Sequence, residues 1–582
     1  MALGALIVPL LILLSSGPVW SGELTDENLP RVCIEDGCMR GSWMRSVGGE
    51  RFEAFFGIPF AKPPIGELRF ANPVPNDRWA EDELDATGWF PKPPCVQVNL
   101  FIPGREVEGK EDCLYLNVYR PEKKHIEING TAALKLPTVV YIHGGGYFAG
   151  YNSPLVAGAE KLMDHPVILV TITYRLGAFG FLSTGDEAAS GNFGLKDQRL
   201  ALRWVHRNIR AFGGDPRLVT IMGHSAGGAS VQLQMMHLAN EGLFQRAISM
   251  SGSVLAPWSM PPVNPEQVAR LQAALVGIKN AKTMSTSKLV KALRAIDADR
   301  IASSITNGSP FPVFVYGPTV EKATVEDAFL IASPQKLWSQ GAYLPVPWLT
   351  GMLPNDGFIF SAPLLNLTTQ TRLAKASLQL EAILLYALRG TNNPNALALL
   401  KERFFSNCNE TFKRYHITLF LQLINEVDFY YPLILSVKQQ LQYSKESRAP
   451  IYLYKFNYKG QFSYSSVYVT GDNTTLSRDF GIVHGDELIY IFRTPALFPD
   501  FQPGSPDAQV SQRLNKFLVY FARTGRLKRK SNLSGSTASK RDGFPLALEF
   551  FNNVNQQDPL GLRHTSIYDK YIFNFWTKIY GS

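Results

Sequence analysis

The pentapeptide Gly223-His224-Ser225-Ala226-Gly227 carries the strongest chemical signal in the chain. It follows a β-branched apolar run at residues 218–222 and precedes a helix-like run, the strand–turn–helix context that exposes a nucleophilic serine. In so sharp a turn, a side chain at either glycine would collide with neighbouring backbone. We therefore interpret Ser225 as a nucleophile that attacks an acyl carbon, and His224 as a wall residue of the site.

A serine hydroxyl needs a neighbouring base, because its own pKa lies far above neutrality. His484 is the candidate, since it lies late in the chain, between glycines, at the end of an apolar stretch. Hydrolases with this serine turn place their residues in the order serine, acid, histidine. The other late histidines fit less well: His416 lies in an apolar, helix-like stretch typical of a core, and His564 lies among charged residues near the C-terminus.

Asp356 is the candidate acid. It follows the apolar stretch 346–349 in the loop sequence Asn355-Asp356-Gly357. A carboxylate at the end of a strand could orient the imidazole of His484 and stabilise its charged form. The same residues are also typical of a turn without chemistry, so the pattern alone leaves both interpretations open.

A second glycine motif, His143-Gly144-Gly145-Gly146, ends the apolar run at residues 138–142. Acyl transfer builds a negatively charged oxygen that needs N–H donors fixed in place beforehand. Glycines let the backbone approach that oxygen without a Cβ in the way. We predict that the amides of Gly145, Gly146 and Ala226 form this oxyanion hole.

These residues need a scaffold, and three apolar runs predict it. Residues 138–142, 167–173 and 218–222 are short and β-branched, and a helical pattern spans residues 194–212 between the last two. Strands that are apolar on both faces and joined through a helix are typical of a parallel sheet covered on both sides. The fold class is therefore α/β.

The N-terminus and the sequons predict export. Residues 1–22 resemble a signal peptide: an apolar run, a Ser-Ser-Gly-Pro break and then small residues, although no Lys or Arg precedes the run. Later in the chain we find no stretch long enough to span a membrane and no C-terminal anchor. We expect a secreted, extracellular glycoprotein with a signal peptide at 1–22, one domain at 23–582, and candidate glycosylation sites at Asn129, Asn307, Asn366, Asn409, Asn473 and Asn532.

Five cysteines leave at least one without a partner in the same chain. Cys33 and Cys38 flank a tight turn and could close a disulfide across a hairpin. Cys95 and Cys113 bracket a loop that an oxidising compartment would allow to close. Cys408 is then the remaining thiol.

The net charge of +9 does not identify a partner. The basic run at residues 523–541 is rich in Ser, Thr and Gly and contains a sequon, which is typical of a solvated insertion loop. The sequence gives no recognisable nucleic-acid-binding motif and implies no metal or other cofactor. The expected partner is a small apolar ester, and the oligomeric state stays open.

Beyond these residues, the chain resembles the type-B carboxylesterases and cholinesterases from about residue 30 to 577. The resemblance rests on many specific stretches, among them Phe56-Gly57-Ile58-Pro59-Phe60-Ala61, Glu111-Asp112-Cys113-Leu114-Tyr115-Leu116-Asn117, Tyr174-Arg175-Leu176-Gly177-Ala178-Phe179-Gly180, Gly191-Asn192, Phe212-Gly213-Gly214-Asp215-Pro216 and Ser251-Gly252-Ser253.

The resemblance implies a single α/β-hydrolase domain with a central, mostly parallel mixed sheet flanked by helices, and hydrolysis of carboxylic esters through an acyl-enzyme. It places the acid at Asp356, where most members have Glu, so that a shorter side chain must reach His484. It also implies the Cys95–Cys113 disulfide, a supporting role for Ser251, and two structural ion pairs, Arg69 with Glu111 and Arg175 with Asp197.

Departures from the family narrow the substrate. The loop between Cys95 and Cys113 contains no Trp, the residue with which cholinesterases bind quaternary ammonium, so choline esters are not expected. The stretch 224–235 resembles insect β-esterases and juvenile hormone esterases, and residues 254–258 are expected to line an apolar acyl pocket. Two alternatives stay open: a non-catalytic adhesion relative, and a slow-turnover protein that sequesters esters.

Overall fold

The computed structural model describes residues 29–79, 83–88, 92–99, 106–122, 135–304, 315–365, 384, 387–388, 391–405, 416–443, 449–470, 479–527, 540–541, 544–553 and 559–581. The predicted signal peptide, all six sequons and Cys408 lie outside these residues.

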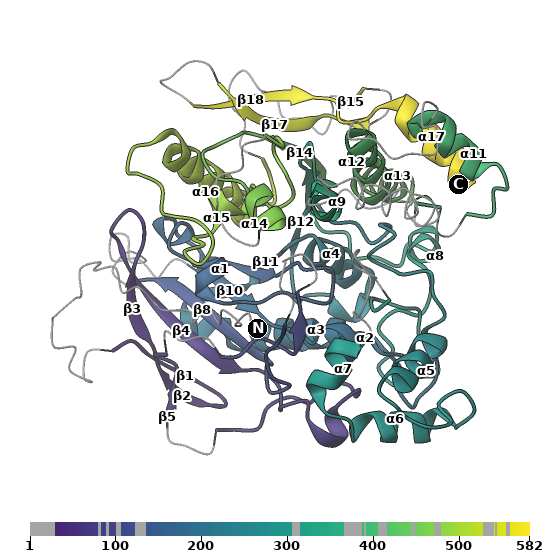
Figure 1. The fold of residues 1–582 in the computed structure, drawn as a ribbon. Coiled ribbons are helices and arrows are strands. Elements are labelled where there is room, and N and C mark those ends of the chain that lie inside the picture. Colours follow the sequence, from purple (N-terminus) through teal and green to yellow (C-terminus); the bar gives the residue numbers. More distant parts are fainter. Residues whose placement is uncertain are drawn as a thin grey trace, which may run out of the picture.

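Within the described residues, an 11-stranded mixed sheet crosses the molecule in the order β18-β17-β14-β13-β12-β11-β9-β10-β8-β4-β3 (Figure 1). From β10 through β9 and β11 to β17, neighbouring strands are parallel, and the strands at both edges pair antiparallel. The bounds are β3 (Ser42–Arg45), β4 (Arg51–Pro59), β8 (Tyr115–Pro121), β9 (Leu136–Ile142), β10 (Ile168–Ile172), β11 (Gly214–His224), β12 (Arg246–Met250), β13 (Trp348–Met352), β14 (Ile451–Asn457), β17 (Ala547–Asn552) and β18 (Leu560–Thr565).

The three predicted strands correspond to β9, β10 and β11, and the predicted helix is α3 (Phe193–Asn208), continued by the 3₁₀ turn η5 (Ile209–Phe212). Strand β9 is buried along its whole length. Val140 belongs to the core cluster that includes α3 and α4 (Ala226–Met236), whereas Val139 belongs to the cluster that includes α16 (Pro506–Thr524). Alternate side chains therefore bury both faces of the sheet, as the apolar runs predicted.

The other described helices lie mainly in the connections after β12 and at the C-terminus. They are α1 (Pro154–Ala157), α2 (Gly177–Phe181), α5 (Pro265–Leu275), α6 (Thr286–Arg294), α7 (Ala298–Ser304), α8 (Pro334–Ser339), α9 (Phe358–Leu365), α11 (Ala396–Phe405), α12 (His416–Asn425), the π-helix η7 (Glu426–Tyr430), α13 (Tyr431–Tyr443), α14 (Tyr464–Thr470), α15 (Leu488–Ile491) and α17 (Lys570–Tyr580). In the described part of the chain, none of these helices is both long and apolar enough to cross a bilayer.

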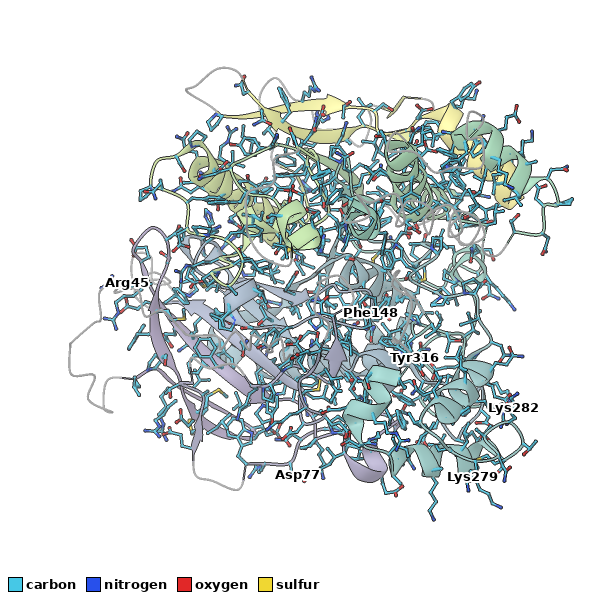
Figure 2. All side chains as sticks on the ribbon, viewed as in Figure 1. Arg45, Asp77, Phe148, Lys279, Lys282 and Tyr316 are labelled. Atoms are coloured by element: carbon cyan, nitrogen blue, oxygen red, sulfur yellow. A yellow bond between two sulfur atoms is a disulfide. The ribbon has the colours of Figure 1, made fainter. Side chains whose placement is uncertain are left out.

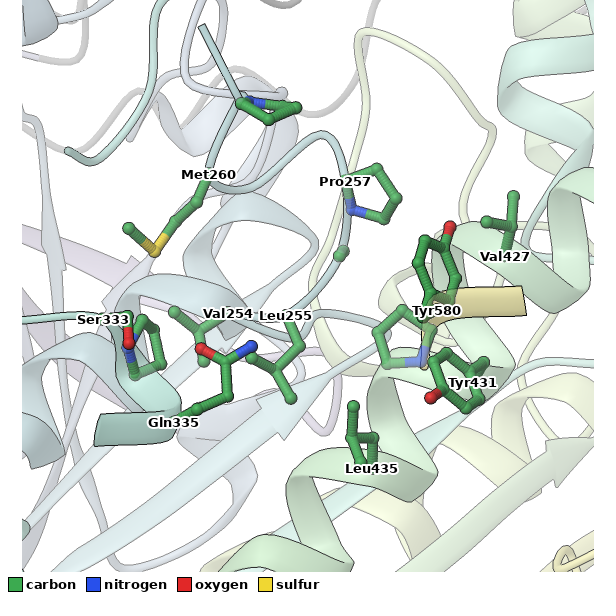
Figure 3. Close-up of a pocket in the computed structure, with 14 residues that line it drawn as sticks. Val254, Leu255, Pro257, Met260, Ser333, Gln335, Val427, Tyr431, Leu435 and Tyr580 are labelled. Atoms are coloured by element: carbon green, nitrogen blue, oxygen red, sulfur yellow. The ribbon is translucent and has the colours of Figure 1, made fainter. Parts of the chain in front are cut away.

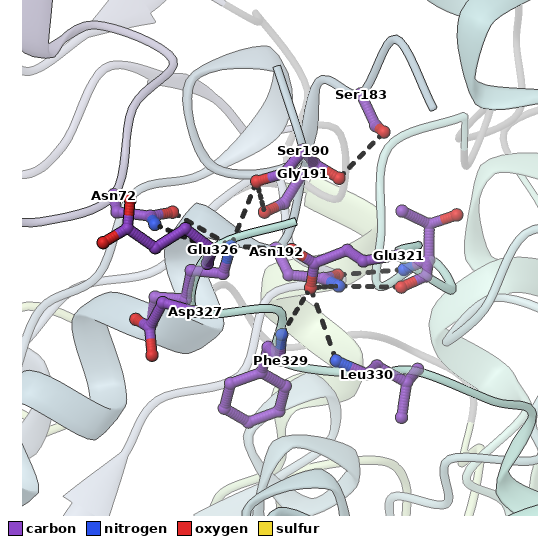
Figure 4. A network of polar contacts seen from close by, with 12 residues as sticks. Asn72, Ser183, Ser190, Gly191, Asn192, Glu321, Glu326, Asp327, Phe329 and Leu330 are labelled. Carbon is purple, nitrogen blue, oxygen red and sulfur yellow. Dashed lines mark hydrogen bonds and ion pairs between the residues drawn. The ribbon is translucent and has the colours of Figure 1, made fainter. Parts of the chain in front are cut away.

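A buried polar network fixes the start of α3 (Figure 4). The ammonium of Lys196 lies 2.6 Å from Oε1 of Glu321, and the side-chain amide of Asn192 donates to Oε2 of the same carboxylate at 2.6 Å. Oε2 of Glu321 also accepts from the amide of Phe329 at 2.8 Å. The network ties the segment that contains Glu321 and Phe329 to the helix that supports β11.

The N-terminal hairpin is as the cysteine spacing suggested. Strands β1 (Arg31–Ile34) and β2 (Gly37–Arg40) pair antiparallel, with Cys33 opposite Cys38, and a disulfide joins them.

At another edge of the molecule, Lys279 and Lys282 project into solvent near α6, whereas Tyr316 is buried (Figure 2).

Candidate active site

Ser225 occupies a strained turn between β11 and α4. Its backbone has φ 57° and ψ −124°, a conformation that is costly for a residue with a side chain and that persists where the surroundings impose it. A Cβ on Gly223 would lie 2.2 Å from the carbonyl oxygen of Gly227, and a Cβ on Gly227 would lie 2.0 Å from that of Ile142. Both glycines are therefore sterically required, as the pentapeptide predicted.

Parallel strands bring the predicted residues to one edge of the sheet. Strands β9, β11, β12 and β13 are neighbours, and their carboxyl ends lead to Gly145, Ser225, Ser251 and Asp356 respectively. Ligands of open α/β sheets bind at this edge. The fold thus gathers residues that are more than 200 positions apart in the chain.

His484 and Asp356 form a buried pair. Nδ1 of His484 lies 2.8 Å from Oδ1 of Asp356, and Oδ2 of Asp356 accepts from Ser251 Oγ at 2.9 Å and from the amide of Leu353 at 2.8 Å. Both oxygens of the Asp356 carboxylate therefore accept hydrogen bonds. The Nδ1 atom of His484 is engaged with Asp356, which leaves Nε2 as the other ring nitrogen. Nε2 is buried and has no hydrogen-bond partner among the described residues.

Two hydrogen bonds from Asn355 join the loop that carries Asp356 to the loop that carries His484. The amide of Asn355 donates to the carbonyl of Ile482 at 3.1 Å, and the side-chain amide of Asn355 donates to the carbonyl of Phe480 at 2.9 Å. The loop that carries Asp356 thus lies directly against the loop that carries His484.

Asp486 holds the turn that carries His484. Its carboxylate accepts from the amide of Val483 at 2.9 Å, from the amide of Tyr464 at 2.7 Å and from Ser463 Oγ at 3.0 Å. The hydroxyl of Tyr468 donates to the carbonyl of His484 at 2.9 Å. Helix α14 and this turn are therefore fixed to each other.

Burial sets the charge of the pair. Desolvation raises the pKa of Asp356 to about 7, although the hydrogen bonds from Leu353 and Ser251 oppose this rise. Desolvation also lowers the pKa of His484 below its ordinary value. At neutral pH the imidazole is therefore uncharged, which is the form that can accept a proton.

The glycine-rich turn after β9 lies against the serine. A Cβ on Gly144 would be 3.0 Å from Cβ of Ser225, and Gly145 and Gly146 have φ 104° and 62°. Gly145 and Gly146 lie in this turn, and Ala226 begins α4, so its amide lies at a helix N-terminus. The turn geometry suits the predicted oxyanion hole, because only glycine adopts such angles freely.

Two aromatic rings pack against His484, and only one of them, His224, was predicted from the sequence to lie in the site. His224, taken as a wall residue, lies beside it with ring centroids 4.3 Å apart, and burial lowers the pKa of His224 well below its ordinary value. Phe429, from the π-helix η7, packs on it at 5.0 Å. No sequence signal pointed to Phe429, because its contact joins positions 55 residues apart through tertiary packing.

The two other late histidines lie on elements outside the His484–Asp356 pair. His564 lies on β18 at the edge of the sheet, and His416 begins α12. Asp356 pairs with His484 and with neither of these.

The Cys95–Cys113 disulfide, implied by the resemblance, is present. Both ion pairs implied by the resemblance are also present: Arg69 Nε lies 2.6 Å from Glu111, and Arg175 Nε lies 2.8 Å from Asp197. In the portion of the chain that the structure describes, no cluster of three or more His, Cys, Asp or Glu residues could hold a metal ion.

With fold and site described, comparison with known proteins identifies the class. A model of the Carboxylesterase family matches residues 28–548. The chain belongs to this family, has the α/β-hydrolase fold and is a carboxylic ester hydrolase.

Several relatives are insect esterases. The chain is 36% identical over 532 residues to the juvenile hormone esterase of Tribolium castaneum, covering 89% of this chain and 88% of that one. It is 33% identical over 475 residues to venom carboxylesterase-6 of Apis mellifera, covering 80% of each. The crystal structure of juvenile hormone esterase from Manduca sexta with OTFP covalently attached superimposes with a TM-score of 0.80 and 25% identity, covering 95% of this chain and 100% of that chain.

Proposed function

We propose that this protein hydrolyses carboxylic esters through an acyl-enzyme on Ser225, with His484 as general base and Asp356 as the acid that orients it. The observation that carries the proposal is the buried His484–Asp356 hydrogen bond at the sheet edge where the strained Ser225 turn lies. This is the arrangement that activates a serine hydroxyl, recognised by geometry and not by sequence position.

In the proposed mechanism, Nε2 of His484 takes the Ser225 proton while Oγ forms a bond to the ester carbonyl carbon. The carbonyl electrons move to oxygen, and the amides of Gly145, Gly146 and Ala226 stabilise that charge. The carbon–oxygen bond to the alcohol breaks, and the alcohol leaves with the proton from His484. Water, deprotonated by the same imidazole, then cleaves the acyl-enzyme and restores Ser225.

We infer an apolar ester and a secreted, single-domain enzyme, supported by the predicted leader, the sequons and two disulfides typical of oxidising compartments. The juvenile hormone esterases among the similar proteins make a terpenoid methyl ester one candidate. A general β-esterase acting on small esters is the other.

The test is Ser225→Ala, assayed with p-nitrophenyl acetate and butyrate. We expect kcat/KM to fall by about 10³-fold or more, with the melting temperature nearly unchanged, because alanine keeps the Cβ and therefore the same backbone strain. Ser339→Ala, at an exposed position on α8, serves as control. A Ser225→Ala variant with more than a tenth of wild-type activity would refute the mechanism.

Active-site titration distinguishes the non-hydrolytic alternatives. An organophosphate that labels Ser225 stoichiometrically, followed by measured turnover, indicates an enzyme. Stoichiometric labelling without turnover would instead indicate an ester-sequestering protein, and absence of labelling would indicate an adhesion relative.

A further inference from the structure

Helix α3 (Figure 1) and the turn η5 carry a row of arginines on their outer face. Arg203 and Arg207 lie one turn apart in α3, and Arg210 lies one turn further on, in η5. All three are exposed, whereas Leu200 and Trp204 of the same helix are buried in the core. Side chains three or four positions apart project from the same face, so these three residues form an arginine row about 10 Å long.

The arginine row lacks the acidic partners that its neighbours have. One turn before it, Arg199 forms an ion pair with Asp327. Beyond η5, the guanidinium of Arg217 lies 3.1 Å from the carboxylate of Asp215. Within the part of the chain that the structure describes, no guanidinium group of the row forms a hydrogen bond or an ion pair. The row is therefore a concentration of positive charge that the fold does not neutralise.

The positive charges of the row act on one another and on a nearby acid. Burial, together with the charges of Arg199 and Arg207, lowers the pKa of Arg203. Burial raises the pKa of Asp36, at the turn of the β1–β2 hairpin, and the charges of Arg207 and Arg78 oppose that rise. Like charges one helical turn apart repel each other, so an anion bound along the row would relieve this repulsion.

Two described pockets are less suited to an anion than the row is. Figure 3 shows a pocket of about 360 Å³ between residues 254–262 and α13, and no charged side chain lines it. In another pocket, of about 450 Å³, the guanidinium of Arg493 is already bonded to Glu160 and Asp500. The arginine row lines neither pocket and lies on the outer surface of a helix. It therefore suits an extended anion that lies along the helix.

The surroundings of the row favour a sulfated polysaccharide among extended polyanions. Guanidinium groups bind anionic oxygens through two parallel N–H bonds. Neither α3 nor η5 exposes a large apolar side chain that could insert into a bilayer. The same segment exposes no Phe, Tyr or Trp on which nucleic-acid bases could stack. A sulfated polysaccharide such as heparin needs neither feature and binds to clusters of basic residues.

We propose that Arg203, Arg207 and Arg210 bind the sulfate groups of a linear sulfated polysaccharide and so hold the enzyme at an extracellular surface. The choice of this polyanion rests on the proposed secretion of the protein. Segment η5 leads into the amino end of β11, whereas Ser225 follows its carboxyl end. The row and the nucleophile thus lie toward opposite edges of the sheet, and the bound enzyme keeps its active site open to small esters.

The test measures the Kd of the full-length protein for heparin at physiological ionic strength. In the triple variant Arg203→Gln/Arg207→Gln/Arg210→Gln, we expect Kd to rise at least about tenfold and to depend less on NaCl concentration, because fewer counterions are released on binding.

A matched control removes the same charge elsewhere. Lys279→Gln/Lys282→Gln/Lys291→Gln alters three exposed lysines near α6 and leaves the arginine row intact, so its Kd should change less than about twofold.

Two further measurements distinguish sulfate recognition from charge alone. Replacing the three arginines of the row by Lys keeps the charge but loses the planar fork of donors, so we expect a Kd between those of the wild type and the Gln variant. This variant also carries the test if the Gln variant does not fold. Chemically desulfated heparin should bind the wild type more weakly than heparin does. The rate of p-nitrophenyl acetate hydrolysis should be the same with and without saturating heparin.

Any of four results would overturn the proposal. The wild type does not bind heparin at physiological ionic strength; the arginine and lysine triple variants lose equal affinity; only Lys528→Gln/Arg529→Gln/Lys530→Gln, in the other basic run, loses affinity; or phosphatidylserine vesicles bind more tightly than heparin. The proposed nucleophile is tested separately, because Ser225→Ala should abolish ester hydrolysis and leave heparin binding unchanged.

Discussion

Nδ1 of His484 lies 2.8 Å from Oδ1 of Asp356, and the two side chains are 1% and 0% exposed. A hydrogen bond at this position fixes which ring nitrogen carries the proton, and so leaves Nε2 free to accept one. Because the pair is shielded from water, its geometry and its charge depend on the protein alone.

Replacing the acid should disable the base without unfolding the protein. In Asp356→Asn, the amide can stabilise the wrong imidazole tautomer, so we expect kcat for p-nitrophenyl acetate to fall by about 10³–10⁴-fold. Asp507→Asn, which alters a buried carboxylate bonded to Tyr458, is a control for general damage. Equal losses in the two variants would argue against the role of Asp356.

The pH profile should report a single proton shared by the pair. Burial raises the pKa of Asp356 to about 7 and lowers that of His484. At high pH the pair therefore carries one negative charge, and as the pH falls the first proton that binds to the pair neutralises that charge. Activity is present above this pKa and is lost as the pH falls through it. We expect log kcat/KM to decline with unit slope below a midpoint near pH 7, measured from pH 4 to 9. A slope of two, or a midpoint below pH 5, would contradict this coupling.

The serine turn should not tolerate a methyl group at either glycine. A Cβ at Gly223 or Gly227 would lie 2.2 or 2.0 Å from a backbone carbonyl oxygen, so the turn must shift. We expect Gly223→Ala and Gly227→Ala to lose activity and at least about 3 kcal/mol of unfolding free energy. Gly242→Ala, with φ +84° but open space around its Cβ, should lose only about 1 kcal/mol. Denaturant unfolding measures both, and wild-type stability in Gly227→Ala would refute the steric argument.

The two disulfides should contribute unequally. Cys95–Cys113 closes a loop with a sequence separation of 18 and Cys33–Cys38 one of 5. Loop-closure entropy predicts about 3 kcal/mol for the longer loop and about 2 kcal/mol for the shorter. Unfolding of the double-serine variants of each pair gives the two values. A larger loss from the Cys33–Cys38 pair would mean that native contacts, and not chain entropy, dominate.

Local pattern was sufficient for the central strands and for the sharp turn at Ser225. The apolar runs at residues 138–142, 167–173 and 218–222 are buried strands, and the Ser225 turn has the steric constraints that its glycines implied. Hairpin spacing correctly suggested the Cys33–Cys38 bond. These features depend on neighbours in sequence, whose geometry is set by backbone sterics and by the two-residue period of a strand.

What tertiary structure alone decided is which distant groups meet. The local residues around Asp356 were also compatible with a plain turn, and only the resemblance favoured an acid there. In the structure its loop is bonded to the backbone at Ile482, and its carboxylate is bonded to His484 and Ser251. The contact of Phe429 with His484 had no signal in the sequence. Local sequence patterns encode which residues are apolar, small or nucleophilic. The pairing of loops and the register of a π-helix arise only from packing over the whole chain.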